Sequence, residues 1–376
     1  MEIKMFKNYR LRDYDFKLVL MILALSAIGV FTIGSAEESL QMRQLFGVIA
    51  GFALMTGLSF FNYNTILKLN WLIYAGMLAL LGLVLLVGEG RGVAQRWLEI
   101  GSLRFQPSEL AKILLILFFA QYIMKYKEKF NSLRVIASCV ILAGIPWVMV
   151  YKQPDLSTSL MLIVIFCIIM FAGGISFKWV LAAAALVVPA AAIVLSLALQ
   201  PDSTILQQYQ KNRILSFVDP ERYSDDRTQQ NNSVMAIGSG QLDGKGYRNN
   251  EITSVKNGNF LSEEETDFIF AVIGEEFGFK GSAAVILLLM GIALECISVA
   301  RKAKDVGGTV IAAGMGGLVA VQGFVNIGVA TFILPNTGLP LPFVSYGLTS
   351  LMSLYIGMGV VLNVRLQPKK SNNQSL

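Results

Sequence analysis

Long runs of apolar residues, separated by short polar stretches, repeat along the whole chain. An α-helix rises 1.5 Å per residue, so about 20 apolar residues cross the roughly 30 Å hydrocarbon core of a membrane. Such runs occur at residues 17–35, 43–61, 67–87, 108–124, 133–150, 157–173, 178–199, 268–300, 307–333 and 346–363. The pattern predicts an all-α integral membrane protein, with residues 1–376 forming a single polytopic bundle of about ten transmembrane helices.

Basic residues gather in polar stretches that an even number of helices places on one side of the membrane. They lie before residue 18, in the 125–134 turn, at Lys178, in the 301–304 turn and in the tail from Arg365. Loops rich in Lys and Arg stay on the cytoplasmic side, so we expect both termini in the cytoplasm. The first apolar run lacks a small-residue cleavage site after it, and we expect it to be retained as a helix.

Two long connections then fall on the outer side of the membrane. One covers residues 88–107, and the other is a large extracytoplasmic loop, residues 201–266, between helices 7 and 8. The second is rich in Asp, Asn, Gln and Gly. Long loops inside a compact protein are usually either functional or disordered.

Two apolar stretches do not fit a simple upright helix. The run 268–300 would reach about 50 Å as one helix, and Gly274, Gly278 and Gly281 interrupt it. We therefore expect a short interfacial piece first and the span itself from about Gly281. Residues 334–345 contain three prolines. Irregular backbone at membrane depth survives only where protein or a wet cavity satisfies it, which predicts a cavity on the outer side near this segment.

Composition narrows the chemistry. The chain has no histidine, which removes imidazole bases, His-ligated zinc and His-centred triads. Cys139, Cys167 and Cys296 lie in apolar runs without paired spacing, so we expect buried small residues and neither a disulfide nor a metal site. The net charge of +6 comes largely from residues at the ends of spans, which argues against nucleic acid as a partner.

Glu109 and Lys112 stand three residues apart in an otherwise apolar span. At this spacing they share one helix face and can pair. Charges inside a membrane are costly, so they indicate a functional site by default and should face the bundle interior. A purely structural ion pair that locks two helices together is the alternative.

The outer loop before this span carries Arg91, Arg96 and Arg104, on the side where the orientation rule does not expect basic residues. A guanidinium group can bind two phosphate oxygens at once, so these residues suit a phosphate group. Interfacial anchoring, with Trp97 as a membrane-belt aromatic, is the alternative. Ser108 precedes the apolar run and is a candidate N-cap, whose outward-facing helix N-terminus would add to an anion site.

Two aspartates stand where the chain enters the membrane from the outside. Asp155 lies in the tight turn Gln153-Pro-Asp-Leu, and Asp267 ends the stretch Glu263-Glu-Glu-Thr-Asp. At the re-entry of the large loop, near Asp267, partial desolvation would make a carboxylate a better general base. Each aspartate could instead cap the helix that follows, and residue type alone leaves both functions open.

The glycine-rich stretch 238–246 has a superficial likeness to a phosphate-binding loop. It lacks the four-residue spacing between its glycines before Lys245, and Gly246 stands where such a loop needs Ser or Thr. We interpret it as a turn in the outer loop.

Several segments of the chain, taken together and in their order along the sequence, resemble the SEDS (shape, elongation, division, sporulation) family of peptidoglycan glycosyltransferases. The matching segments are 92–97 with 105–112, then 153–156, 266–279 and 339–347. The resemblance spans nearly the whole chain and is nearer the RodA branch than the division and sporulation branches. Leu348 and Thr349 depart from it, because the family usually has glycine and serine there.

The resemblance implies a function. A member of this family polymerises lipid II at the outer face of the bacterial cytoplasmic membrane, with inversion at the anomeric carbon and undecaprenyl pyrophosphate as leaving group. The position that matches the essential aspartate is Asp267, with the implied role of general base. The implied substrate-binding residues are Arg96, Arg104, Gln106, Ser108, Glu109, Lys112, Asp155, Ser345 and Tyr346. No organic cofactor is implied, a divalent cation (Mg or Mn) could assist the pyrophosphate, and the implied protein partner is a class B penicillin-binding protein that packs through its membrane helix among the membrane lipids.

A second function uses similar features. A transporter that flips lipid-linked cell-wall precursors also needs charges inside the membrane and a broken helix. It predicts polar groups near the membrane midplane with access from both faces, whereas an enzyme predicts them clustered near one face. The candidate residues map to the outer third of the predicted bundle, which favours the enzyme.

Overall fold

The computed structural model describes residues 13–88, 96–101, 103–198, 200, 208–218, 224–248, 261 and 263–367. Arg91, one of the three outer arginines, lies outside these residues. Within them, every predicted span overlaps an apolar helix. These helices are α1 (Phe16–Ala36), α2 (Glu38–Ser59), α4 (Asn70–Val87), α5 (Pro107–Lys125), α6 (Leu133–Lys152), α7 (Leu156–Ala172), α8 (Phe177–Ala198), α11 (Ile269–Lys302), α12 (Val306–Ala330) and α13 (Leu348–Leu366).

In the described part of the chain, 8 of these helices are long and apolar enough to cross a membrane. The other two are α7, which has 17 residues, and α8, in which Phe177–Ala190 is the apolar stretch. The predicted class, an all-α polytopic membrane protein, is confirmed. Asp15, Asp155 and Asp305 begin α1, α7 and α12, and each side chain accepts a hydrogen bond from a main-chain N–H of the first turn.

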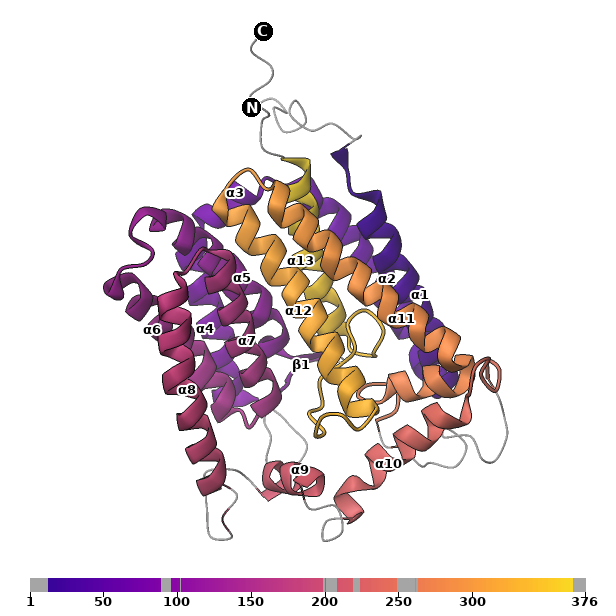
Figure 1. Ribbon diagram of the computed structural model, residues 1–376. Coiled ribbons are helices and arrows are strands. Elements are labelled where there is room, and N and C mark those ends of the chain that lie inside the picture. Colours follow the sequence, from indigo (N-terminus) through magenta and orange to yellow (C-terminus); the bar gives the residue numbers. More distant parts are fainter. Residues whose placement is uncertain are drawn as a thin grey trace.

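Shorter elements occupy the two ends of the bundle. The helix α3 (Tyr63–Lys68) and the 3-10 turn η2 (Lys127–Lys129) lie at one end, and α9 (Gln208–Val218) and α10 (Ser224–Ser239) lie at the other (Figure 1). We call the end that carries α9 and α10 the loop end. The helices α9 and α10 fall within the predicted loop 201–266, so that loop is partly helical.

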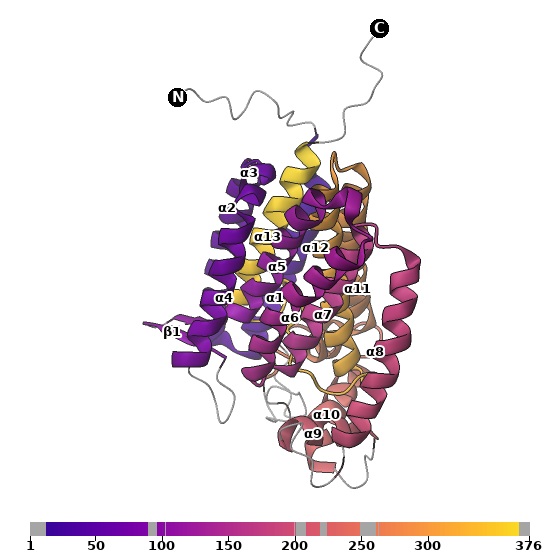
Figure 2. The same ribbon diagram turned by 90° about the vertical axis from the view of Figure 1, so that its left-hand side faces the viewer.

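A small antiparallel hairpin that the sequence did not predict lies in the 88–107 connection. Its strands β1 (Leu98–Ile100) and β2 (Leu103–Phe105) pair Glu99 with Arg104. The turn places Gly101 at φ 65°, a conformation that glycine adopts without strain. The hairpin stands out from the side of the bundle (Figure 2).

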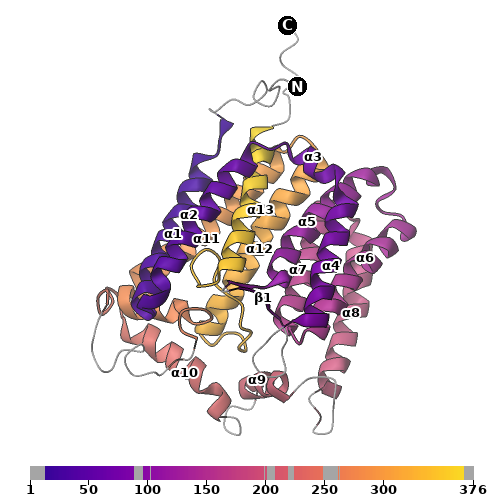
Figure 3. The ribbon, with the colours of Figure 1, turned by 180° about the vertical axis from the view of Figure 1, so that it is seen from behind.

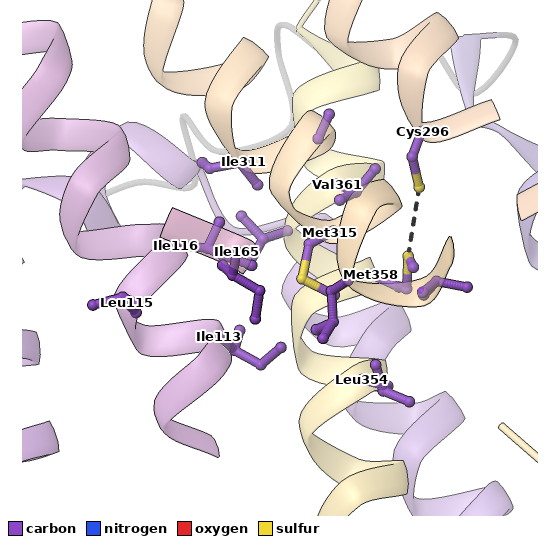
Figure 4. Close-up of a cluster of buried hydrophobic side chains, with 14 of the residues drawn as sticks. Ile113, Leu115, Ile116, Ile165, Cys296, Ile311, Met315, Leu354, Met358 and Val361 are labelled. Atoms are coloured by element: carbon purple, nitrogen blue, oxygen red, sulfur yellow. Dashed lines mark hydrogen bonds between the residues drawn. The ribbon is translucent and has the colours of Figure 1, made fainter. Parts of the chain in front are cut away.

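The bundle has two groups of helices with α12 and α13 between them. On one side α1, α2 and α11 lie together, and on the other α4, α5 and α7 (Figures 1 and 3). The helix α5 contacts α4, α7, α12 and α13 and is the most completely buried of the membrane helices. Figure 4 shows the apolar core where these groups meet, with Ile113 and Ile116 of α5 beside Met315 of α12 and Met358 of α13.

The helix α8 lies at the edge of the bundle (Figures 1 and 2). Its large apolar side chains, such as Leu181, Leu186 and Val188, are exposed in the protein alone. An apolar helix that contacts little protein suits a position among lipid tails. Cys167 of α7 is also exposed, so its predicted burial is wrong, whereas Cys139 and Cys296 are buried. A small apolar side chain serves equally well facing lipid.

The predicted break in the eighth apolar run is confirmed. The helix α11 contains a kink at Gly278, whose φ of 61° and ψ of −157° lie outside the helical region. Within the stretch 238–246, the first two residues end α10 and residues 240–246 form the predicted turn, which lies over this kink. Lys245 and Gly246 donate main-chain hydrogen bonds to the oxygens of Glu275 and Glu276, at 2.9 and 3.0 Å. The turn thereby satisfies carbonyl groups that the break leaves without helical partners.

Candidate functional site

A polar pocket of about 220 Å³ opens at the loop end. It lies where α5 and α7 begin and where α12 gives way to the proline-containing segment before α13. Its lining includes Arg96, Gln106, Glu109, Asp155, Asp267 and Tyr346, all of them candidate residues. It also includes Trp97, Thr158, Glu263, Thr266, Gly338, Leu339, Pro340, Gly347, Thr349 and Ser350. The cavity predicted beside residues 334–345 is therefore present.

Asp155 is both a helix cap and part of the pocket wall. Its Oδ1 accepts from the N–H of Thr158 at 3.1 Å, which confirms the capping interpretation. Its Oδ2 accepts from Gln106 Nε2 at 3.2 Å, and Arg96 Nη1 lies 3.9 Å from Oδ1. Arg96 also donates to the carbonyl of Pro154. This network turns the Arg96 side chain into the pocket and not towards a lipid interface.

Glu109 and Lys112 form a buried ion pair, with 2.7 Å between Lys112 Nζ and Glu109 Oε1. Lys112 also donates to Gln322 Oε1 of α12 at 2.8 Å. Gln322 in turn donates to the carbonyl of Pro340 at 2.9 Å. Glu109 reaches the pocket, whereas Lys112 lies behind it. The pair therefore ties α5 to α12 and to the segment that forms the pocket wall.

Asp267 is half-buried and lies one residue before the N-cap position of α11. The cap residue is Phe268, and the helix begins at Ile269 without a side-chain cap. The interpretation of Asp267 as the cap of this helix is therefore wrong. The main-chain N–H of Asp267 donates to the carbonyl of Glu263 at 3.1 Å, in the tight turn that leads into α11.

The structure places three other candidate residues outside the pocket lining. Arg104 is on the exposed side of the hairpin, and its Nε donates to Glu99 Oε1 at 2.9 Å. Ser345 is buried, and its Oγ donates to the carbonyl of Thr266 at 2.5 Å. Ser108 is buried in the first turn of α5, and its hydroxyl accepts from Gln106 Nε2 at 3.1 Å.

The prediction that Ser108 caps α5 is wrong. The helix begins at Pro107, and Gln106 occupies the cap position. Proline is favoured at the first helical position because its fixed φ suits the helix and its missing N–H needs no partner there. The serine consequently lies two residues past the cap position.

Comparison with known proteins identifies the family. Residues 14–370 match the family model of the cell cycle proteins FtsW, RodA and SpoVE. The chain belongs to this family, which is the SEDS family of the sequence resemblance.

Curated relatives cover nearly the full chain of this SEDS protein. It is 31% identical to the probable peptidoglycan glycosyltransferase FtsW of Bacillus subtilis (strain 168), over 97% of this chain and 93% of the relative. It is 32% identical to the peptidoglycan glycosyltransferase MrdB of Escherichia coli (strain K12), over 94% of this chain and 92% of the relative. The two match about equally well, so the expected nearness to the RodA branch stays a prediction.

Solved structures share the fold of this SEDS protein. One, described as structural coordination of polymerization and crosslinking by a peptidoglycan synthase complex, aligns with a TM-score of 0.77 and 28% identity over 94% of this chain and 97% of that chain. The Rod shape determining protein RodA of Thermus thermophilus aligns with a TM-score of 0.69 and 27% identity, over 94% and 96%. The chain is thus a multi-pass protein of the cytoplasmic membrane.

The pocket of this SEDS protein contains several carboxylates, but they are dispersed. Among the residues that the structure describes, no three His, Cys, Asp or Glu side chains group closely enough to hold a metal ion. Glu109 pairs with Lys112, and Asp155 lies beside Arg96. The described side chains therefore do not form a metal site made of protein ligands alone.

Sequence reasoning missed several polar residues of the site. Thr349 lines the pocket, and its Oγ1 accepts from the N–H of Gln106 at 3.3 Å. Gln322 and Asn326 of α12 are buried behind it. They lie four residues apart in an apolar span, hence on one helix face, and this is the same kind of signal that identified Glu109 and Lys112.

Proposed function

We propose that this SEDS protein is a peptidoglycan glycosyltransferase that polymerises lipid II into glycan strands on the outer face of the membrane. The relatives named as peptidoglycan glycosyltransferases support the activity. The observation that carries the proposed site is one shared pocket at the loop end. Asp267 lines it together with Arg96, Glu109 and Asp155, although these residues come from distant parts of the sequence.

In the proposed reaction, Asp267 is the general base. The 4-hydroxyl of the acceptor sugar attacks the anomeric carbon of the donor, and its proton passes to the Asp267 carboxylate. The new C–O bond forms as the bond to undecaprenyl pyrophosphate breaks, and the bonding pair leaves with the pyrophosphate. A single displacement of this kind inverts the linkage from α to β.

The leaving pyrophosphate needs positive charge nearby. Arg96 is the arginine that lines the pocket, and a guanidinium can place two N–H donors on phosphate oxygens. Arg104 lies on strand β2, just before α5, with an exposed side chain. It would meet the headgroup of the lipid-linked substrate outside the pocket. Gln106 and Tyr346 offer hydrogen-bonding groups to the sugars. A divalent cation, Mg or Mn, is compatible with this charge pattern when carried by the pyrophosphate, and no step above depends on it.

The proposed orientation places the loop end outside the cell and both termini in the cytoplasm. The predicted basic turns support it, because the turn with η2 lies at the end opposite α9 and α10 (Figure 1). The proposed partner is a class B penicillin-binding protein whose membrane helix packs on the bundle. A solved structure of similar fold, described as a peptidoglycan synthase complex for polymerization and crosslinking, supports this pairing. Membrane lipids surround the bundle, and nucleic acid is not an expected partner.

The experiment is polymerisation of purified lipid II by the protein co-purified with its transpeptidase partner. We expect Asp267→Asn to lower the rate by at least about 100-fold, since a positioned general base contributes about 10²–10⁴. The matched control is Asp243→Asn, which removes an exposed carboxylate at the same end of the molecule, ion-paired with Lys280. Full polymerase activity in Asp267→Asn, with normal membrane expression, would refute the assignment of the base.

A further inference from the structure

Three successive carbonyl groups hold the segment that carries Asp267. The oxygens of residues 265–267 accept, in order, from Tyr346 N at 2.9 Å, Ser345 Oγ at 2.5 Å and Asn326 Nδ2 at 2.9 Å. These carbonyls precede the regular part of α11, which begins at Ile269. Their partners come from α12 and from the segment before α13. The position of Asp267 therefore depends on groups that are distant in sequence.

Among these partners, Asn326 bonds Asp267 itself and also bonds the opposite wall of the pocket. It is 1% exposed, and its Nδ2 donates a second hydrogen bond, at 2.8 Å, to the carbonyl of Leu339. A carboxamide nitrogen carries two hydrogens, so each carbonyl takes one. The reverse amide orientation would place an oxygen against two carbonyl oxygens, which fixes the assignment of the nitrogen. One side chain thus joins Asp267 to the Leu339 wall.

The same helix face supports the pocket one turn earlier. Gln322 Nε2 donates to the carbonyl of Pro340 at 2.9 Å, and Gln322 Oε1 accepts from Lys112 Nζ at 2.8 Å. The helix α12 therefore holds both neighbouring residues of the proline-containing wall, Leu339 and Pro340, and through Asn326 it holds them at a set distance from Asp267. Neither Gln322 nor Asn326 lines the pocket. Their action on a substrate can only be indirect.

We propose that Asn326 is a positioning residue, which fixes the Asp267 carboxylate against the proline-containing wall through its two carbonyl hydrogen bonds. This inference rests on the proposed role of Asp267 as general base. A base must lie within hydrogen-bonding reach of the proton it removes. A displacement of about 1 Å at a reacting group costs about 100-fold in rate. Without Asn326 the turn at 263–267 loses the link that sets this distance.

The test compares two buried asparagines that both link main-chain groups of different elements. Asn363 of α13 is 0% exposed, donates to the carbonyl of Ser59 at 2.7 Å and accepts from Tyr63 N at 2.9 Å. It lies at the end of the bundle opposite the pocket, beside α3. Its Oδ1 also accepts from Gln367 Nε2 at 2.9 Å. Asn363→Ala therefore reproduces the loss of a buried, hydrogen-bonded amide without touching the site.

The variants are Asn326→Ala, Asn326→Asp and Asn363→Ala, each purified with the transpeptidase partner. Asn326→Asp nearly preserves volume but replaces both N–H donors with a carboxylate oxygen. Melting temperatures are measured first, and lipid II polymerisation is then followed at a temperature where every variant is folded. We expect kcat to fall about 100-fold in both Asn326 variants, with KM changed less than about threefold. We expect Asn363→Ala to lower the melting temperature comparably and to keep the wild-type kcat.

Two results would overturn the positioning role: an Asn326→Ala variant with kcat within about twofold of wild type, or an Asn363→Ala variant that loses as much kcat as Asn326→Ala. Asp267→Asn is assayed in parallel, which separates this inference from the function on which it rests. If Asp267→Asn is inactive and Asn326→Ala is fully active, only the positioning role fails. If Asp267→Asn is fully active, the base assignment fails and the positioning role fails with it.

Discussion

The ion pair between Glu109 and Lys112 offers a sharp test of how this bundle is held together. Both side chains are nearly inaccessible, with 5% and 2% of the side-chain surface exposed, and their charged atoms are 2.7 Å apart. Surface ion pairs contribute little, but removing one partner of a buried pair leaves a charge without compensation. The sequence left a structural and a functional role open for this pair. Stability and activity measured on the same variants separate the two roles.

The two single substitutions should differ in cost. Lys112→Met keeps the shape of the side chain but leaves two acceptors, Glu109 Oε1 and Gln322 Oε1, without the ammonium that serves both. We expect a loss of about 3–5 kcal/mol, the usual range for a buried charge that loses its partner. Glu109→Gln leaves the ammonium with two neutral amide oxygens as acceptors. The expected loss is smaller, about 1–3 kcal/mol.

The double variant Glu109→Gln, Lys112→Met removes both charges, so it should be more stable than Lys112→Met alone. The assay is unfolding in detergent, followed by near-ultraviolet circular dichroism or by the fraction that stays monodisperse, for all four proteins. The reasoning predicts a coupling free energy of about 1 kcal/mol or more between the two sites. Additive losses would show that the pair does not stabilise the bundle. A Lys112→Met variant no less stable than Glu109→Gln would refute the predicted order of the two losses. Because Glu109 lines the pocket and Lys112 does not, polymerase activity should stay low in the double variant even where stability returns.

Two further predictions concern the kink and the orientation. Gly278→Ala should destabilise the protein by about 1–3 kcal/mol, because the backbone conformation of Gly278 is almost restricted to glycine and an added Cβ would lie 2.4 Å from Gly244 N. The matched control is Gly76→Ala, where an added Cβ meets nothing within 4 Å. Equal melting temperatures of the two variants would contradict the strain argument. For the orientation, both variants are made in a background without the native cysteines. Asn231→Cys on α10 should react with an impermeant thiol reagent in intact cells, whereas Glu128→Cys on the η2 turn should react only after lysis. The reverse pattern would invert the proposed topology.

The helices could be predicted because their signal is local. Each apolar run fixes its own element, and the glycines in 268–300 marked a break that the structure places at Gly278. The β1–β2 hairpin was missed because its strands are only 3 residues each and leave too little alternation to recognise. The departure at Leu348 shows a second limit. The Leu348 side chain packs where Gly47 of α2 leaves room, a compensation that one sequence does not reveal.

The pocket could be predicted only in part, for a physical reason. Asp267, Glu109 and Arg96 carry charge, and a charge at a membrane boundary is conspicuous in an apolar sequence. Asn326 and Gln322 are neutral, so they stand out less, although their four-residue spacing was available. Ser345 is the opposite case: the sequence made it a substrate-binding candidate, whereas in the structure its hydroxyl bonds the carbonyl of Thr266 and does not line the pocket.

A membrane protein can keep a wet pocket only if the irregular backbone around it finds partners, because lipid offers none. Here the turn before α11 and the segment before α13 are both irregular, and the segment before α13 donates hydrogen bonds to carbonyl groups of the turn. The side chain of Ser345, within the segment before α13, and that of Asn326, on α12, each bond main-chain groups of the irregular backbone. The bonds that make the irregular backbone tolerable at this depth are therefore the same bonds that fix the Asp267 carboxylate. Stability of the pocket wall and placement of the proposed base are one requirement in this fold, so substitutions that loosen the wall should reduce turnover before they unfold the bundle.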